Sequence, residues 1–404
     1  MLLCFLLFEY LRLHDVLPIL KTMKVQTAVL AALVLIVIAE MGKGEVRLTR
    51  QGWLLLGFLG LASFTILTAT NNYYAYEFAF ELALMLIAYF AITHILRNER
   101  DVKSFLSLLV GIHVYIAVKV IIGYEGFTAG SYFLGDENDV ALAMTLMLPL
   151  GVYLSRQTQS LPARTFWGAS SIAMLLSIIL SRSRGGFVGI AAIGLYYVVT
   201  GRNKSKAVGV LVLSIMIVIA VAPEGYWEEM ETIKETDSGT AETRRNYWAA
   251  ARRMFYDSPI WGVGGNNYRI LLPDYAYEVS PEQRGTQWGK AAHSMFFDLL
   301  AEFGLLGVLL IASVLLWNFR DLREVRSLSE KGNCSASIQQ LADCLRLSWV
   351  GFLVPAVFLS VLRYPHLYYL TALTVVAHRL ALAESEIMAV EPIGALESGE
   401  WEHT

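Results

Sequence analysis

Apolar runs of membrane length follow one another along most of this chain. A stretch of about 17 to 25 mostly apolar residues can cross the hydrocarbon core of a bilayer as a helix. We predict about twelve such spans, some of them short, near residues 1–20, 25–40, 52–70, 76–96, 104–122, 140–155, 166–181, 187–200, 207–222, 294–317, 346–362 and 366–383. The first is the weakest, because Arg12, His14, Asp15 and Pro18 interrupt it. The pattern therefore predicts an all-α polytopic membrane protein.

One long polar segment, residues 223–292, separates the ninth predicted helix from the tenth. It divides the chain into transmembrane helices 1–9 (residues 1–222), a large external loop with short helices (223–292) and transmembrane helices 10–12 (293–383). Residues 384–404 contain acidic residues, Pro392 and Gly394 without apolar periodicity, so we expect a mobile tail. In a membrane protein, residues that do not span the bilayer are available for chemistry, and the loop is where we look for it.

Composition and loop charge support this organisation. With 56% hydrophobic and 17% charged residues, the chain is not an ordinary soluble protein. Basic residues gather in alternate short loops, which marks those loops as cytoplasmic. The loops 71–75 and 123–139 contain no Lys or Arg, so we place them outside, with the turns at 182–186 and 363–365 and, by parity, the loop 223–292. Both termini are then cytoplasmic.

Cysteine and histidine positions argue against a metal centre. Cys4, Cys334 and Cys344 have a spacing that suits neither a metal site nor a disulfide framework. The histidines other than His293 are scattered among spans, turns and the tail, a distribution that does not favour zinc. We expect no metal and no cofactor, and nothing in the sequence indicates nucleic-acid binding.

Residues 181–186 (SRSRGG) form a tight turn between two predicted spans. Glycines permit a compact reversal, and Arg182 and Arg184 add fixed positive charge, so the turn is a candidate anion site. The alternative is that both arginines reach lipid headgroup phosphates.

Residues 243–255 have helical spacing, which places Arg244 and Trp248 on one face, with Arg245, Arg252 and Arg253 partly around it. Such a helix can lie on a membrane surface. That interpretation suits Arg252 and Arg253 better than Arg244. The glycine-rich turn that follows, residues 261–269 (WGVGGNNYR), matches no phosphate-binding fingerprint, and a structural role is favoured.

His293 begins the tenth predicted helix and is the strongest histidine candidate. Gly304 follows it by eleven positions, nearly a whole number of turns, so we expect both on one helix face, with Gly304 and Gly307 allowing close contact with a neighbouring helix. Asp298 and Glu302 are carboxylates in or near the membrane, where an ionised group is costly and must be paired or functional.

The ordered combination of these motifs resembles the bacterial O-antigen ligase and O-antigen polymerase superfamily. The matching elements are residues 135–139 (GDEND), the turn 181–186, Arg244 before Trp248, Pro259 with residues 262–264 (GVG), and His293 before Gly304. The resemblance covers most of the chain. The ligases carry an Arg-x3-Leu motif in the large loop, and Arg244-x3-Trp248 matches it in part.

The resemblance implies a GT-C type membrane glycosyltransferase in the bacterial inner membrane, with its active site facing the periplasm. It implies metal-independent, inverting transfer of a glycan from an undecaprenyl-diphosphate donor. Arg184 and Arg244 would stabilise the leaving diphosphate, since guanidinium groups bind phosphates without a cation. His293 would be the general base or a diphosphate ligand, Glu242 is an alternative base, and the weaker substrate-binding candidates are Arg182, Arg245, Arg269 and Trp248.

The acceptor stays open between lipid A core, a growing glycan and a protein hydroxyl, and membrane lipids surround the whole. A solute transporter is the alternative from another class. Transporters place ionisable groups and broken helices at the membrane midplane. In this chain charge gathers at the outer surface, which favours the enzyme.

Overall fold

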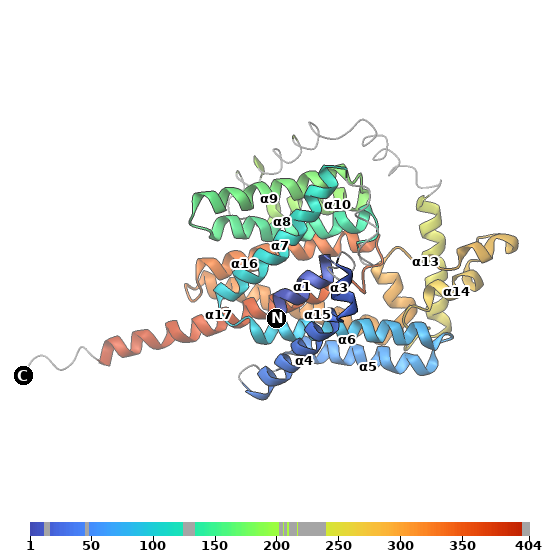
Figure 1. The fold of residues 1–404 in the computed structure, drawn as a ribbon, viewed down its shortest axis with the longest axis horizontal. Coiled ribbons are helices and arrows are strands. Elements are labelled where there is room, and N and C mark those ends of the chain that lie inside the picture. Colours follow the sequence, from blue (N-terminus) through green and yellow to red (C-terminus); the bar gives the residue numbers. More distant parts are fainter. Residues whose placement is uncertain are drawn as a thin grey trace, which may run out of the picture.

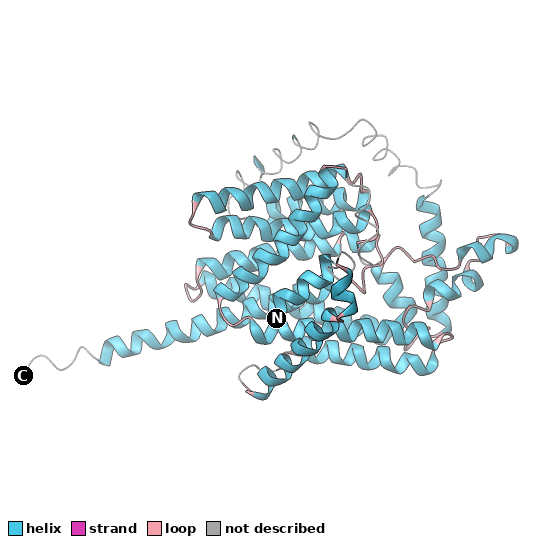
Figure 2. Ribbon diagram, viewed as in Figure 1, coloured by secondary structure: helices cyan, strands magenta, loops and turns pink. Residues whose placement is uncertain are grey.

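In the computed structural model, the described residues form helices and no strands (Figure 2). The structure describes residues 1–11, 17–44, 48–123, 134–201, 205, 208–209, 216 and 240–397. The α-helices are α1 (Leu2–Leu11), α3 (Pro18–Thr22), α4 (Val25–Gly42), α5 (Arg50–Thr68), α6 (Asn72–Ile95), α7 (Glu99–Ile121), α8 (Glu137–Gln157), α9 (Leu161–Leu180), α10 (Arg184–Thr200), α13 (Thr240–Asp257), α14 (Tyr268–Tyr275), α15 (Met295–Glu330), α16 (Ala336–Leu353) and α17 (Pro365–Glu397). Two short 3-10 helices, η3 (Pro281–Gln287) and η4 (Pro355–Val357), complete the set.

The predicted all-α polytopic fold is confirmed. Seven of the described helices, α4 to α9 and α15, are long and apolar enough to cross a membrane. Most of the helices overlap the predicted spans. The predicted span 1–20 corresponds to α1 and α3, with residues 12–16 outside the described part, and α16 begins well before the predicted span 346–362 and ends within it. Most of the span at 207–222 lies outside the described residues. The predicted total of about twelve spans is therefore not confirmed.

The long helices pack in two neighbouring groups (Figure 1). In one, α8 contacts α7, α9, α10 and α16; in the other, α15 contacts α5 and α17, and α6 contacts α4, α5 and α17. Contacts of α16 with α15 and α17 join the groups. The interior is one continuous apolar core that includes large side chains such as Trp349, Phe105 and Tyr153.

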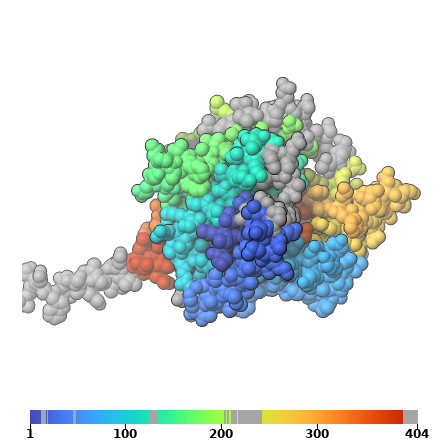
Figure 3. Space-filling model, viewed as in Figure 1, coloured from blue at the N-terminus to red at the C-terminus, as the bar shows by residue number. Residues whose placement is uncertain are grey.

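The short helices α13 and α14 lie beyond one end of this bundle and protrude from it (Figures 1 and 3). They have an apolar core of their own. The i, i+3, i+4, i+7 face of α13, formed by Tyr247, Ala250, Ala251 and Met254, packs with Tyr268 and Leu272 of α14. Because protein covers this face, the interpretation of α13 as a helix lying on lipid is not needed to explain its apolar stripe.

The turn between α5 and α6 lies at the same end of the bundle and is hydrogen-bonded to Asn267 of the loop. The backbone N–H of Asn71 donates to Oδ1 of Asn267 over 2.8 Å, and Nδ2 of Asn267 donates to the carbonyl of Asn71 over 3.1 Å. This placement agrees with the predicted parity, in which the turn and the loop share one side.

Helix α15 is not continuous. Gly304 has φ 57° and ψ −156°, a conformation outside the helical range, and the chain kinks there. In an unbroken helix, the N–H groups of Leu305 and Leu306 would donate to the carbonyls of Ala301 and Glu302. At the kink these two helical hydrogen bonds are absent, so all four backbone groups need other partners.

Residues 259–264 replace the two missing helical hydrogen bonds. Leu305 and Leu306 donate to the carbonyls of Pro259 (2.8 Å) and Ile260 (3.1 Å). The freed carbonyls of Ala301 and Glu302 accept from Val263 (2.9 Å) and Gly264 (3.0 Å). A spanning helix can be interrupted only where its backbone groups find other partners, and the loop supplies all four.

The glycines of both segments are required by this close approach. A Cβ on Gly262, which has φ +73°, would lie 2.3 Å from the carbonyl carbon of Glu302. A Cβ on Gly304 would lie 2.7 Å from the carbonyl carbon of Ile260. Both positions also have positive φ, which side-chain-bearing residues rarely adopt.

Two expectations about the last helices are wrong. The tenth span begins at Met295, with His293 outside it in a left-handed conformation, so His293 and Gly304 are not related by helical steps. Gly304 admits the backbone of the loop instead of a neighbouring helix. At the C-terminal end, α17 extends beyond the last predicted span and continues to Glu397.

We predict that Gly262→Ala destabilises the protein by roughly 2–4 kcal/mol, from overpacking added to backbone strain. Gly285 lies in the same loop, and a Cβ added there would have no atom within 4 Å, so Gly285→Ala is the matched control. Thermal unfolding of the purified variants in detergent measures the difference. Equal unfolding temperatures for both variants would contradict the proposed backbone contact.

Candidate active site

The N-termini of α8 and α10 meet at the end of the bundle that α13 covers. Asp136 caps α8, accepting hydrogen bonds from the backbone N–H groups of Asn138 (2.8 Å) and Asp139 (2.9 Å). Ser183 caps α10 by accepting from the N–H of Gly186 (3.1 Å), and its hydroxyl donates to Oδ1 of Asn138 (2.8 Å). The motifs 135–139 and 181–186 are thus one hydrogen-bonded unit.

The turn 181–186 differs in detail from the expected glycine reversal. Its left-handed residue is Arg182, with φ 53°. Gly186 serves helix packing, because a Cβ there would lie 2.7 Å from the Cβ of Ala141 on α8. Arg184 is the first residue of α10, so its position is fixed by the Ser183 cap, whereas Arg182 is exposed.

Arg244 extends from the first part of α13 into this end of the bundle. Its side chain is half-buried, with the guanidinium carbon 6.0 Å from the centre of the Phe358 ring. The Nε atom is buried and has no hydrogen-bond partner among the described residues. A buried donor without an acceptor is costly, so this atom marks a place where a ligand oxygen would be stabilising.

His293 is held between α13 and the start of α15. Its ring stacks on Tyr247, with 6.3 Å between ring centres and 20° between planes. Two hydrogen bonds hold the preceding residue, Ala292, in place. The indole N–H of Trp248 donates to the carbonyl of Ala292 over 3.0 Å, and the N–H of Ala292 donates to the carboxylate of Asp298. Ser294 then occupies the N-cap position of α15, although its side chain makes no capping hydrogen bond. The left-handed φ of 51° at His293 is therefore imposed by its neighbours.

Arg244 is close enough to Arg184, Asp136 and His293 to interact with each of them electrostatically, and Asp136 also acts on His293. Burial lowers the pKa of Arg244, the charge of Arg184 lowers it further, and Asp136 opposes this. Burial likewise lowers the pKa of His293, followed by Arg244, while Asp136 raises it and Lys290 lowers it. His293 therefore stays a neutral proton acceptor further into the acidic range than an ordinary histidine. Two guanidinium groups that repel each other would be stabilised by an anion bound between them.

A second polar cluster lies beside this site, around a cavity of about 30 Å³. Arg269 and Arg363 face the buried carboxylates of Asp298 and Glu302 there. Glu302 accepts from the N–H of Tyr268 over 3.3 Å, which ties α14 to α15. The cavity has room for about one water molecule. Asp298 and Glu302, which were expected to be paired or functional, therefore lie within the electrostatic influence of Arg269 and Arg363.

The remaining candidates occupy the edges of the site. Glu242 and Arg245 are exposed on α13, and Glu242, two residues before Arg244, points to nearly the opposite side of the helix. Trp248 is engaged by Ala292 and stacks on Phe297, with 5.0 Å between ring centres. Arg253, in contrast to the surface-anchoring interpretation, pairs with Glu278.

Three residues of this region had no role assigned from the sequence. Asp136 lies within a quoted motif, but its effect on both Arg244 and His293 depends on the fold. Tyr364 donates to Asp139, and Arg363 pairs with Glu81 over 2.9 Å. The presence of Arg363 in a short outer turn otherwise poor in basic residues was the available signal.

Residues 169–312 match the family model described as O-antigen ligase. The matched range contains Arg184, Arg244 and His293, and it ends within α15. A search of curated proteins finds no match.

We predict that Arg244→Gln raises the pKa of His293, because it removes a positive charge that disfavours the imidazolium form. Asp136→Asn should lower that pKa further, and asparagine keeps the helix cap. NMR titration of histidine-labelled protein, with His293→Gln to assign the signal, measures both shifts. Shifts in the same direction for the two variants would contradict this electrostatic arrangement.

Proposed function

We propose that this protein is a membrane glycosyltransferase of the O-antigen ligase and polymerase superfamily that transfers a glycan from an undecaprenyl-diphosphate donor. The match of residues 169–312 to the O-antigen ligase family model supports this proposal. We place the reaction on the periplasmic face of the bacterial inner membrane, with both chain termini in the cytoplasm. The proposed acceptor is the lipid A core. In this scheme the bundle anchors the enzyme, and residues 240–292 form the described periplasmic part over the site.

The observation that carries the proposal is the buried Nε of Arg244, which lacks a partner among the described residues, in the field of Arg184 and close to His293. A lipid diphosphate supplies the oxygens and the negative charge that such a site lacks. Guanidinium groups bind phosphate oxygens through paired hydrogen bonds and keep their charge at all physiological pH values. The N-terminus of α10, whose first residue is Arg184, has no acidic residue in its first turn, and its helix dipole also favours an anion.

In the proposed reaction, an acceptor hydroxyl attacks the anomeric carbon from the face opposite the diphosphate. The new carbon–oxygen bond forms as the bond to the diphosphate oxygen breaks, and that electron pair leaves with the diphosphate. Arg184 and Arg244 stabilise the charge that grows on the leaving group. Neutral His293 takes the hydroxyl proton, and the anomeric configuration inverts.

His293 is preferred to Glu242 as the base because Glu242 is exposed and directed away from Arg244. Trp248 and Asp298 would act by holding Ala292, and therefore His293, in place. Exposed Arg182 and Arg245 remain candidates for contacts to the glycan. Arg269 would act through the carboxylates that it faces.

We predict that Arg184→Ala, Arg244→Ala and His293→Ala each reduce glycan transfer by at least about 100-fold, the usual effect of removing a group that stabilises transition-state charge. The assay uses purified protein, an undecaprenyl-diphosphate-linked donor and a chelator. Arg252 lies on the same helix and is exposed, so Arg252→Ala is the control that keeps activity. Retained transfer in all three variants would remove the proposed site.

Deletion of the gene in its source organism identifies the acceptor. We expect glycan to disappear from lipid A core. Shortened glycan chains would indicate a polymerase, and loss of glycan from protein would indicate a protein O-oligosaccharyltransferase. Unaltered glycans with altered solute uptake would overturn the enzyme assignment in favour of transport.

A further inference from the structure

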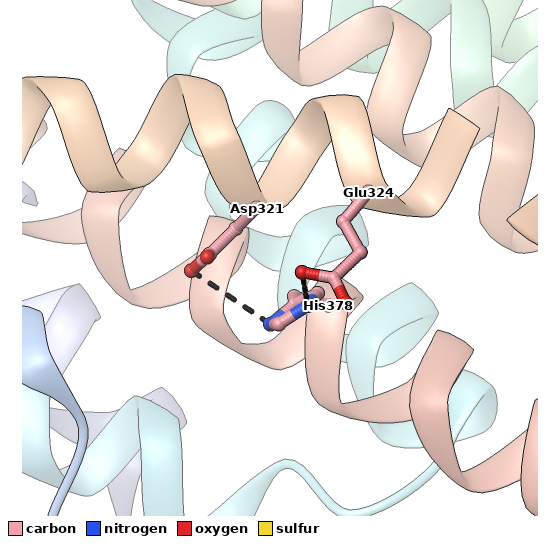
Figure 4. Close-up of side chains that lie close together, drawn as sticks. All are labelled: Asp321, Glu324 and His378. Carbon is pink, nitrogen blue, oxygen red and sulfur yellow. Dashed lines mark ion pairs between the residues drawn. The ribbon is translucent and has the colours of Figure 1, made fainter. Parts of the chain in front are cut away.

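Three potential metal ligands meet at the other end of α15, remote from His293. Asp321 and Glu324 lie three residues apart, so both carboxylates occupy the face of α15 directed at α17. His378 of α17 points between them (Figure 4). One ligand atom from each residue can be chosen so that all three lie within 4.8 Å of one another. The scattered positions of the histidines along the chain gave no sign of this cluster.

The three groups do not satisfy one another by hydrogen bonding. Nε2 of His378 lies 3.2 Å from Oε2 of Glu324, but it is buried and lacks the alignment of a hydrogen bond. Nδ1 of His378 lies 3.8 Å from Oδ2 of Asp321. The two carboxylates therefore lie beside different nitrogens of one imidazole ring, and neither contact is a hydrogen bond.

A hydrogen bond fixes the side chain of Asp321, whereas the side chain of Glu324 is partly exposed. Asp321 is held by Gln51 of α5, whose side-chain amide donates to Oδ2 over 2.5 Å. A hydrogen bond from a neighbouring side chain fixes the orientation of a metal-binding carboxylate. Glu324 has a side chain 46% exposed, against 19% for His378, so it gives a cation access from solvent. The nearby guanidinium groups of Arg50 and Arg320 lie over the Trp317 ring.

We propose that Asp321, Glu324 and His378 bind a divalent cation of the zinc class. Imidazole with carboxylates is a common ligand set for zinc, and three protein ligands leave a position for water. Tetrahedral ligands about 2.1 Å from the metal lie about 3.4 Å apart, so rotation of the exposed Glu324 side chain is enough to close the site. The ion joins α15 to α17 and, through Gln51, to α5.

This cation is separate from the proposed glycosyl transfer. Asp321 lies roughly 40 Å of helix from the first residue of α15, counting about 1.5 Å per residue. The ion therefore serves the packing of three helices. Its removal is expected to lower stability, while transfer persists at temperatures where the protein stays folded.

Zinc binding by the full-length protein, freed of any affinity tag and stripped with a chelator, tests the site. We expect about one Zn²⁺ per chain by calorimetry and metal analysis, and at least tenfold weaker binding for His378→Gln and Glu324→Gln. Glu330→Gln, an exposed carboxylate on the same helix, is the matched control and should bind like wild type. Mg²⁺, which prefers oxygen ligands, should bind at least tenfold more weakly than Zn²⁺.

Thermal unfolding separates loss of the site from loss of the fold. Zn²⁺ should raise the unfolding temperature of the wild type and of Glu330→Gln, and not that of His378→Gln or Glu324→Gln. Without metal, Glu324→Gln should unfold close to wild type, because Glu324 is half-exposed. Absence of zinc binding at millimolar concentration, or equal binding by His378→Gln, would overturn the proposal and leave a simple ion-pair cluster.

Discussion

The exchange of backbone hydrogen bonds between residues 259–264 and the kink of α15 governs the rest of this structure. A helix at membrane depth cannot leave its N–H and C=O groups without partners. The break at Gly304 exposes two of each, and the loop fills all four positions. Once this segment is fixed, α13 precedes it and α14 follows it closely, so both must pack against the first part of α15. The placement of Arg244 over the ends of α8 and α10 follows from that docking.

The same docking explains why His293 lies outside a helix. Trp248 hydrogen-bonds the carbonyl of Ala292 and Asp298 accepts from its N–H, and Ser294, the N-cap residue of α15, follows His293 directly. One residue must then cover the distance between two fixed neighbours, and it does so in a left-handed conformation. Its ring is directed to Tyr247 and the arginines by the backbone. The chemistry of the proposed base therefore depends on contacts that involve neither substrate nor proton transfer.

Hydrophobic length predicted the long helices well, because a spanning segment needs no distant partner to be identified. The break in α15 was not predictable in this way: Gly304 reads as a small residue at a helix interface, and its partner segment lies some forty residues earlier in the chain. Arg184, Arg244 and His293 were selected through the family resemblance, since no local spacing relates them. Asp136 has the sequence pattern of an ordinary helix cap, and Asp321 and His378 belong to different helices. Their roles depend on tertiary contacts that periodicity does not encode.

Gly262 and Gly304 also determine where the outer loop can change over evolutionary time. An insertion or deletion within residues 259–264 would shift the register of four backbone hydrogen bonds and reopen the helix. Residues 277–291, by contrast, are mostly exposed around η3 and contact α13 and α14 at few points, such as Glu278 with Arg253 and Gln287 with Tyr247. A change of length there leaves the inserted segment intact. Relatives that accept different substrates are therefore expected to differ in this outer stretch and to keep the length of the stretch between Pro259 and Gly264.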